Sequence, residues 1–249
     1  MTTRLFHISD VHFGVEDRAA LDAVVRAVAD EKPDALVVTG DLTQRAKHSE
    51  YAAAAQWFGA LELPIVLEPG NHDMPYYNLL ERFTDPYRRF RRLQKAVGAT
   101  FATKDVVLVS LKSTVRAQAR FPWSDGFVTS KALRRTVGHL EQLKGDPRHV
   151  IVTAHHPLLG PEGVRRNPTI GGERAFSALA AAGADAVLTG HVHHPFDEVR
   201  KCASGAIRMI GAGTLSTRLR HGAPPSYRLI TAGLGEPLEV ELRELPIPA

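Results

Sequence analysis

Five short apolar runs in this chain of 249 residues each end in a cluster of aspartate, asparagine or histidine. With the polar residues that follow them, the runs read "RLFHISDVH", "ALVVTGD", "PIVLEPGNHD", "HVIVTAHH" and "AVLTGHVHH". Such brief runs, rich in β-branched residues and bounded by Gly, Pro or Asp, are typical of buried strands. Helix-like segments at 17–31 and 49–61 alternate with the first three runs, which predicts an α/β fold with a parallel sheet.

The rest of the chain contributes further elements to the same domain. We predict two helices over 74–98, a hairpin over 99–113 and a helix over 130–143, and the alternating runs after residue 195 indicate an antiparallel closing sheet. Four arginines between 88 and 92 are read as a solvated helix face, with a substrate-binding patch as the alternative. Because no repeat or linker interrupts the chain, we expect a single domain over 1–249.

Composition limits the cellular setting and the partners. No apolar run approaches the roughly 20 residues needed to span a bilayer. The N-terminus lacks the features of a secretory signal, and the single cysteine, Cys202, fits a reducing compartment, so we expect a cytoplasmic protein. The net charge of +4 favours anionic partners such as phosphate esters, although solubility alone would also account for it.

The polar clusters predict a metal site at one edge of the sheet. In open α/β sheets, ligands bind outside the carboxyl ends of the strands, and burying so many polar groups without a use would cost free energy. The seven candidate ligands are Asp10, His12, Asp41, Asn71, His155, His191 and His193. Imidazole, carboxylate and amide oxygen without a thiolate suit Mn, Fe, Co or Zn.

Seven ligands exceed what one ion needs and suffice for two ions that share a bridging carboxylate. Two such ions can hold both oxygens of a phosphoryl displacement and lower the pKa of a bridging water. Two divalent ions, two aspartates and one hydroxide leave a net charge of about +1, which one phosphodiester neutralises. The ligand set therefore favours a phosphate ester as substrate.

The blocks "SDVHFG", "TGDLTQ", "PGNHD", "TAHHP" and "TGHVHH" occur in this order between residues 9 and 194. Together they resemble the signature blocks of the calcineurin-like metallophosphoesterases. The tail "GAGTLSTR…PPSYRLI" is similar to that of bacterial class III cyclic-nucleotide phosphodiesterases. The resemblance implies a four-layer α/β/β/α sandwich with a dimetal site on loops at the C-terminal strand ends.

The resemblance also implies roles for individual residues. The first metal would be held by Asp10, His12 and His193, and the second by Asn71, His155 and His191, with Asp41 bridging. His72 would contact the phosphoryl oxygen or the leaving group, and Asp73 would orient His72 by a hydrogen bond to its other ring nitrogen. On this hypothesis a metal-bridging hydroxide attacks phosphorus, and His72 or water protonates the leaving alkoxide.

Several residues near these blocks receive weaker assignments. We expect His156 to support a ligand or the fold, His194 to be a bystander and His7 to be a core histidine. Specificity is expected from loops around the metals. Candidate substrate contacts are therefore Arg165 and Arg166, in the loop 157–173, and Arg218, with solvent exposure as the alternative for each.

The resulting functional hypothesis is hydrolysis of a small-molecule phosphodiester, with a 3',5'-cyclic nucleotide as the favoured substrate. Alternatives are a glycerophosphodiester, the pyrophosphate of a UDP-lipid and, least favoured by the mildly basic charge, nucleic acid. A UDP-lipid hydrolase would be expected to show an apolar lid helix, for which only residues 76–93 qualify. A catalytically silent scaffold would be expected to lack some of the ligand residues in these blocks, whereas every block here is intact. A homodimer is compatible with the sequence.

Overall fold

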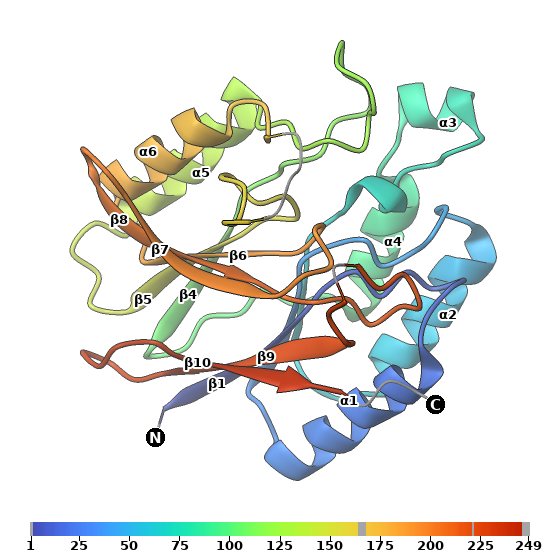
Figure 1. The fold of residues 1–249 in the computed structure, drawn as a ribbon, viewed down its shortest axis with the longest axis horizontal. Coiled ribbons are helices and arrows are strands. Elements are labelled where there is room, and N and C mark those ends of the chain that lie inside the picture. The colour runs from blue at the N-terminus through green and yellow to red at the C-terminus, as the bar shows by residue number, and fades with distance from the viewer. Residues whose placement is uncertain (1, 164–167, 221, 246–249) are drawn as a thin grey trace.

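The structure is a computed structural model that describes residues 2–163, 168–220 and 222–245. Two five-stranded sheets form its centre (Figure 1). The first sheet has the order β10-β9-β1-β2-β3, and the second has the order β4-β5-β6-β8-β7. The strands of the first sheet are β1 (Thr3–Ile8), β2 (Ala35–Val38), β3 (Ile65–Leu67), β9 (Ser226–Ala232) and β10 (Glu239–Glu244). Those of the second are β4 (Val106–Ser110), β5 (His149–Thr153), β6 (Ala186–Thr189), β7 (Phe196–Cys202) and β8 (Gly205–Gly211).

Each sheet is parallel in the part that carries the candidate ligands. The pairs β1–β2 and β2–β3 are parallel in the first sheet. The pairs β4–β5, β5–β6 and β6–β8 are parallel in the second. β9 and β10 extend the first sheet in antiparallel fashion, and β7 closes the second in the same way. The carboxyl ends of the parallel strands therefore gather at one edge of each sheet, as the sequence predicts.

Helices cover the outer face of each sheet. They are α1 (Arg18–Glu31), α2 (His48–Gly59), α4 (Arg88–Val97), α5 (Ser130–Gln142) and α6 (Gly172–Ala181). A further short helix, α3 (Leu79–Thr84), contributes no residue to the buried apolar cores, and a 3-10 turn spans Asn71–Asp73. The α1 helix begins after Asp17, whose side chain accepts a hydrogen bond from the backbone N–H of Ala20 at 3.1 Å. In the described residues no helix is both long and apolar enough to cross a membrane.

Three buried apolar cores separate four layers. One core, which includes Phe6 and Leu36, lies between the first sheet and the helices α1, α2 and α4. Another, which includes Val152 and Phe176, lies between the second sheet and α5 and α6. The third lies between the two sheets and includes Ile151. The predicted four-layer α/β/β/α sandwich is thus confirmed.

Two smaller predictions are wrong. The four runs after residue 195 do not form one closing sheet, because β7 and β8 join the second sheet while β9 and β10 join the first. β8 and β9 carry apolar residues on both faces, so each needs a position that is buried on both sides. The hairpin expected over 99–113 is reduced to a single antiparallel bridge between Ala102 and Val107, and β4 pairs with β5 instead.

Candidate active site

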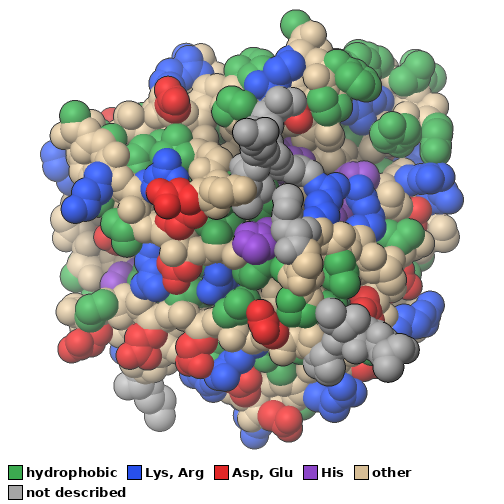
Figure 2. All heavy atoms as spheres, viewed as in Figure 1, with side chains coloured by type: hydrophobic (Ala, Val, Ile, Leu, Met, Phe, Trp, Pro, Cys, Tyr) green, Lys and Arg blue, Asp and Glu red, His purple; other side chains and the backbone are tan. Residues whose placement is uncertain are grey.

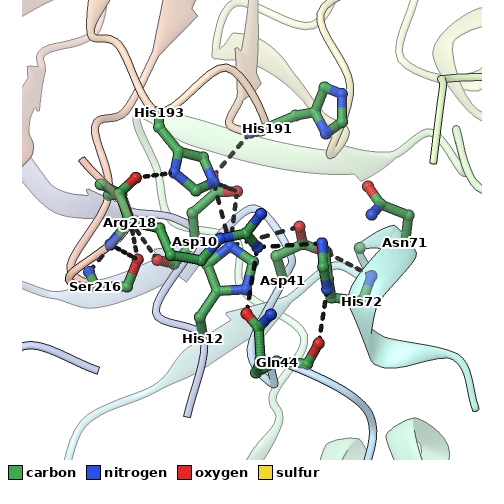
Figure 3. A network of polar contacts seen from close by, with 12 residues as sticks. Asp10, His12, Asp41, Gln44, Asn71, His72, His191, His193, Ser216 and Arg218 are labelled. Atoms are coloured by element: carbon green, nitrogen blue, oxygen red, sulfur yellow. Dashed lines mark hydrogen bonds and ion pairs between the residues drawn. The ribbon is translucent and has the colours of Figure 1, made fainter. Parts of the chain in front are cut away.

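The predicted ligands meet where the carboxyl ends of both sheets come together (Figure 3). Asp10 and His12 follow β1, Asp41 follows β2, and Asn71 follows β3 in the first sheet. The second sheet supplies His155 after β5, and His191 and His193 after β6. Backbone hydrogen bonds tie these loops together, for instance from Asp10 N–H to Gly40 O at 3.0 Å and from Gly190 N–H to His155 O at 2.9 Å.

A first group of ligand atoms comes from Asp10, His12 and His193. Asp10 Oδ1 lies 3.1 Å from His193 Nε2 and 3.7 Å from His12 Nε2, and the two Nε2 atoms are 3.2 Å apart. All three side chains are buried. They bring one carboxylate oxygen and two imidazole nitrogens to a single point.

A second group is joined to the first through Asp41. Asp41 Oδ2 lies 3.8 Å from His12 Nε2 and 3.4 Å from His155 Nε2. His155 Nε2 is in turn 3.2 Å from Asn71 Oδ1. The ring of His191 lies beside that of His155, with centroids 5.2 Å apart. Asp41 is therefore the carboxylate that borders both groups of ligand atoms.

Two of the candidate histidine ligands form a hydrogen bond to a backbone carbonyl through Nδ1, the ring nitrogen that does not face the other ligand atoms. His155 Nδ1–H donates to Thr39 O and His193 Nδ1–H donates to Arg218 O, each at 2.7 Å. A histidine held in this tautomer presents the lone pair of Nε2 to a metal. Asp10 Oδ1 is buried and lies 3.1 Å from His193 Nε2, where a metal ion would be shared between the two atoms. These donor atoms, directed at one point, fit a cation.

Electrostatics keep three of the candidate ligands, His12, Asp10 and Asp41, in the protonation states that a metal needs. Burial lowers the pKa of His12 to about 3, so its imidazole is neutral. Burial would raise the pKa values of Asp10 and Asp41, but neighbouring imidazoles, chiefly His193 for Asp10 and His155 for Asp41, outweigh it. Both carboxyl pKa values lie well below their usual range, and both groups are ionised. Burial would lower the pKa values of His155 and His193, but the neighbouring carboxylates outweigh it and raise the pKa of His155 to about 9 and that of His193 above its usual value. A bound metal would therefore displace a proton from each of these two rings.

The backbone adopts an unusual conformation at most of these positions. Eight non-glycine residues of the described segments have a positive φ, which costs free energy for an L-residue. Five of them are candidate ligands: Asp10 (54°), His12 (50°), Asp41 (52°), His191 (70°) and His193 (57°). The left-handed turns direct side chains that leave neighbouring strands toward one point.

Two glycines leave space for the ligand side chains. A Cβ at Gly190 would overlap Ser9 Oγ and lie 2.5 Å from Asp10 Oδ2. A Cβ at Gly70 would overlap the Asp41 carboxylate and its backbone nitrogen. The glycines of the "TGH" and "PGN" blocks are thus required by close approach of the ligands.

His72 is held at the border of the two groups by three contacts. Its backbone N–H donates to Asp41 Oδ1 at 2.8 Å, and its Nδ1–H donates to Gln44 O at 2.7 Å. The Nε2 atom of His72 is then left with a lone pair, which accepts a hydrogen bond from Arg218 Nη1 at 3.2 Å. Arg218 Nη1 also lies 3.2 Å from Gln44 Oε1 (Figure 3). The structure therefore brings Arg218 beside His72, and it adds Gln44, which the sequence analysis missed.

The predicted role of Asp73 is wrong. Its carboxylate does not contact the His72 ring, because it accepts hydrogen bonds from the backbone N–H groups of Leu42, Thr43 and Gly70 at 2.8–3.2 Å and from Thr43 Oγ1 at 3.0 Å. Burial raises the pKa of Asp73 to about 7. Asp73 therefore connects the "TGD" and "PGNHD" loops to each other. The hydrogen bond to His72 Nδ1 that was predicted for Asp73 is made by Gln44 O instead.

The remaining predicted residues fall into three groups. His156 Nδ1 lies 2.9 Å from Ser113 Oγ and Nε2 lies 2.9 Å from Ser124 O, so this ring supports the neighbouring loop as expected. His7 is a buried histidine whose Nε2 lies 2.9 Å from Thr39 Oγ1. Arg165 and Arg166 lie outside the described residues.

Known proteins share these features of sequence and fold. The calcineurin-like phosphoesterase family model matches residues 3–195. A probable cyclic nucleotide phosphodiesterase from Pseudoalteromonas sp. is 26% identical over 208 residues, which cover 78% of this chain and 73% of the relative. The glycerophosphodiester phosphodiesterase GpdQ from Enterobacter lignolyticus is 31% identical over 194 residues, which cover 71% of this chain and just 64% of the relative.

Solved structures show the same fold at low sequence identity. A dimetal phosphatase from Danio rerio superposes with a TM-score of 0.62 at 13% identity, covering 96% of this chain and 98% of its own. A purple acid phosphatase from yellow lupin seeds gives a TM-score of 0.69 at 12% identity, covering 98% of this chain and 52% of its own. With the family match over most of its length, the chain belongs to the calcineurin-like phosphoesterases and is a metal-dependent phosphoester hydrolase with a dinuclear metal centre.

Proposed function

We propose that this enzyme is a phosphodiesterase whose substrate is a 3',5'-cyclic nucleotide. The observation that carries the proposal is the arrangement around Asp41, whose Oδ2 borders both groups of ligand atoms. A relative named as a probable cyclic nucleotide phosphodiesterase supports the choice of substrate. The single Cys202 supports a cytoplasmic location, where such a substrate would be met.

The ligands divide into two sets in this proposal. Asp10, His12 and His193 would hold the first ion, Asn71, His155 and His191 would hold the second, and Asp41 would be shared by both. Two bound ions would supply positive charge against the phosphoryl oxygens and a water of lowered pKa. Manganese, iron, zinc and cobalt all suit these nitrogen and oxygen ligands.

His72 and Arg218 act on the substrate from one side of the ligand groups. The Arg218 guanidinium donates hydrogen bonds to a phosphoryl oxygen, where negative charge grows in the transition state. His72 is kept in place by Gln44 O and by the Asp41 carboxylate, with Nε2 directed at the same space. When Arg218 turns from Nε2 to the phosphoryl oxygen, Nε2 would be free to take up a proton and donate it to the leaving alkoxide.

A glycerophosphodiester is the second candidate substrate. It is favoured by the 31% identity to GpdQ, which is named as a glycerophosphodiester phosphodiesterase. Both substrates are diesters with a single negative charge, so the charge of the site accepts either. The groups beyond the phosphate distinguish them, and those groups would meet the loops around the site.

A substrate panel tests the proposal. The enzyme is loaded with Mn²⁺, and kcat/KM is compared for cyclic nucleotides, acyclic diesters including glycerophosphodiesters, monoesters and UDP-lipids. We expect the highest kcat/KM for a cyclic nucleotide, and a higher kcat/KM for any other class would overturn that choice. Asn71→Ala and His72→Ala should each lower turnover of bis(p-nitrophenyl) phosphate far more than they change the unfolding temperature. Near-normal turnover in both would refute the mechanism.

A further inference from the structure

The short helix α3 buries its charged side chains and exposes its large apolar side chains. Its charged residues Glu81 and Arg82 are 6% and 5% exposed, whereas Leu79, Leu80 and Phe83 are 59%, 76% and 44% exposed. Burial of charge and exposure of large apolar side chains both cost free energy in water. A surface helix of a water-soluble enzyme has the opposite arrangement, so this helix presents its apolar side for contact with something other than water.

The exposed apolar side chains form a larger surface, which we call the apolar crest. It consists of Tyr76, Tyr77, Leu79, Leu80, Phe83 and Phe121. The Tyr76 and Tyr77 rings are 5.1 Å apart, and the Phe83 ring meets that of Trp123, two residues after Phe121, at 6.1 Å. Figure 2 shows hydrophobic side chains gathered over α3 at the upper right, with Lys and Arg side chains beside them.

Specific contacts hold the crest in this orientation. Glu81 Oε1 accepts a hydrogen bond from Arg88 Nη2 at 2.7 Å, and Arg89 pairs with the other carboxylate oxygen. Arg82 donates through Nε to Arg116 O at 2.7 Å, which ties α3 to the loop that bears Phe121. The buried charges of α3 are thus satisfied, and they keep its apolar residues facing outward.

The segment that carries α3 and α4 has an excess of positive charge. Residues 75–97 contain six basic and two acidic side chains, a net charge of +4, which equals the net charge of the whole chain. Both acidic residues are paired with arginines, Glu81 with Arg88 and Arg89, and Asp85 with Arg91. Arg92 and Lys95 on α4 are exposed. An occupant of the crest would therefore meet apolar and aromatic side chains beside a cationic border.

We propose that the apolar crest docks on an anionic lipid membrane. Exposed Leu, Phe and Tyr side chains can enter the boundary between headgroups and acyl chains, while flanking Arg and Lys side chains bind acidic headgroups. A second copy of this chain fits less well, because a symmetric contact would bring two segments of net charge +4 together. Of the arginines at 88–92, which the sequence predicts as a solvated face, Arg92 is exposed and supplies the cationic border together with Lys95, whereas the other three pair with Glu81 or Asp85.

The crest adjoins the candidate active site. It begins three residues after Asp73, and the guanidinium of Arg45 lies 5.7 Å from the Tyr77 ring centroid. Arg45 directly follows Gln44, whose carbonyl oxygen accepts the hydrogen bond from His72. A docked enzyme would thus hold its active site next to the layer of lipid headgroups.

Co-sedimentation with vesicles tests the proposal on the full-length, metal-loaded chain. One set of vesicles mixes phosphatidylglycerol with phosphatidylcholine, and the other contains phosphatidylcholine alone. We expect at least tenfold tighter binding to the anionic set, and at least a tenfold loss in the double variant L80Q/F121Q. The variant R92E/K95E should lose binding severalfold. Val199→Gln is the matched control, because Val199 on β7 is 62% exposed and lies outside the crest.

Two results would overturn the proposal. One is wild-type binding that does not exceed that of L80Q/F121Q on anionic vesicles. The other is a wild-type protein that does not bind vesicles but forms a dimer in light scattering, together with an L80Q/F121Q variant that is a monomer. That result would assign the crest to contact with a second copy of the chain. Circular dichroism checks folding, and turnover of bis(p-nitrophenyl) phosphate should be unchanged in the variants. Because vesicle binding needs no turnover, its failure and failure of the proposed phosphodiesterase activity are distinguishable.

Discussion

Arg218 Nη1 lies 3.2 Å from His72 Nε2, although the two residues are 146 positions apart in the chain. The side chain of Arg218 faces the space where a phosphoryl group would bind, while its carbonyl oxygen accepts the Nδ1–H of His193. In the proposed function, one residue would therefore contact the substrate through its guanidinium, while its backbone carbonyl supports the candidate ligand His193. The two contributions are separable by mutation.

Arg218→Gln should lower kcat/KM for bis(p-nitrophenyl) phosphate by about 10²-fold, as expected for the loss of one donor to developing charge. Arg218→Lys keeps the positive charge and should recover part of the loss. The content of bound metal should not change, because the support of His193 comes from the backbone. Arg220→Gln serves as the control for loss of an arginine in the same loop. Equal loss of metal and activity in Arg218→Gln would contradict this separation.

The histidines of "GHVHH" should differ in metal analysis. His193→Ala removes an Nε2 atom from the first group and His191→Ala removes a ring from the second, so each should reduce bound metal from two ions to one per chain. His194→Ala should retain both ions and near-normal turnover. Elemental analysis after dialysis measures the ratio, and metal loss in His194→Ala equal to that in His193→Ala would disprove the assignment.

Gly190→Ala should destabilise the fold, because the added Cβ overlaps Ser9 Oγ and crowds Asp10. Overpacking of this kind costs about 1–3 kcal/mol in the free energy of unfolding, and displacement of Asp10 should also weaken metal binding. The same substitution at Gly138 provides the control. Gly138 lies within α5 with no atom in the way of a Cβ, so Gly138→Ala should stabilise the protein slightly. Chemical denaturation compares the two, and equal effects would show that crowding is not the cause.

Glu68 should make stability depend on pH. Burial raises its pKa to about 7, and its carboxyl oxygens lie 2.6 Å from Thr153 Oγ1 and 2.9 Å from Ser110 Oγ in the opposite sheet. Between about pH 4.5 and 7 the folded state keeps this proton and the unfolded state loses it, so the free energy of unfolding falls as pH rises. The total is on the order of 3 kcal/mol.

Glu68→Gln removes the titration while preserving the shape of the side chain. Subtracting the denaturation free energies of the variant from those of the wild type at each pH cancels the other titrating groups. The difference should decline from pH 4.5 to 7 and stay flat above that range. A difference that does not vary with pH would mean that the pKa of Glu68 is the same in the folded and unfolded states.

The positions of the candidate ligands were predictable because strand ends are local features of the sequence. His155 and His191 follow apolar runs directly, and the parallel order of those runs brings their ends together. The partner of Asp73 was not predictable, since it depends on how the loop at 40–44 folds over the turn at 71–73. Gln44 was missed for the same reason, because it acts through its backbone carbonyl, which every residue has.

The inversion of α3 was also beyond reach of sequence patterns. Residues 79–84 read as an ordinary helix, and the buried side is decided by Arg88 and Arg89, which hold Glu81 from the next helix. The same limit applies to β8 and β9, whose separation into two sheets follows from packing on both faces. Contacts between distant segments decided each of these outcomes.

Each group of candidate ligands contains residues from both sheets. Asp10 and His12 come from the first sheet and His193 from the second, while Asp41 and Asn71 come from the first and His155 and His191 from the second. Each bound ion would therefore act as a cross-link between the halves of the sandwich, in addition to the apolar inter-sheet core and hydrogen bonds such as those of Glu68 to Thr153 and Ser110. Metal binding and the association of the two sheets would therefore be thermodynamically coupled. The ions that the enzyme needs for hydrolysis would also stabilise the contact between its two halves.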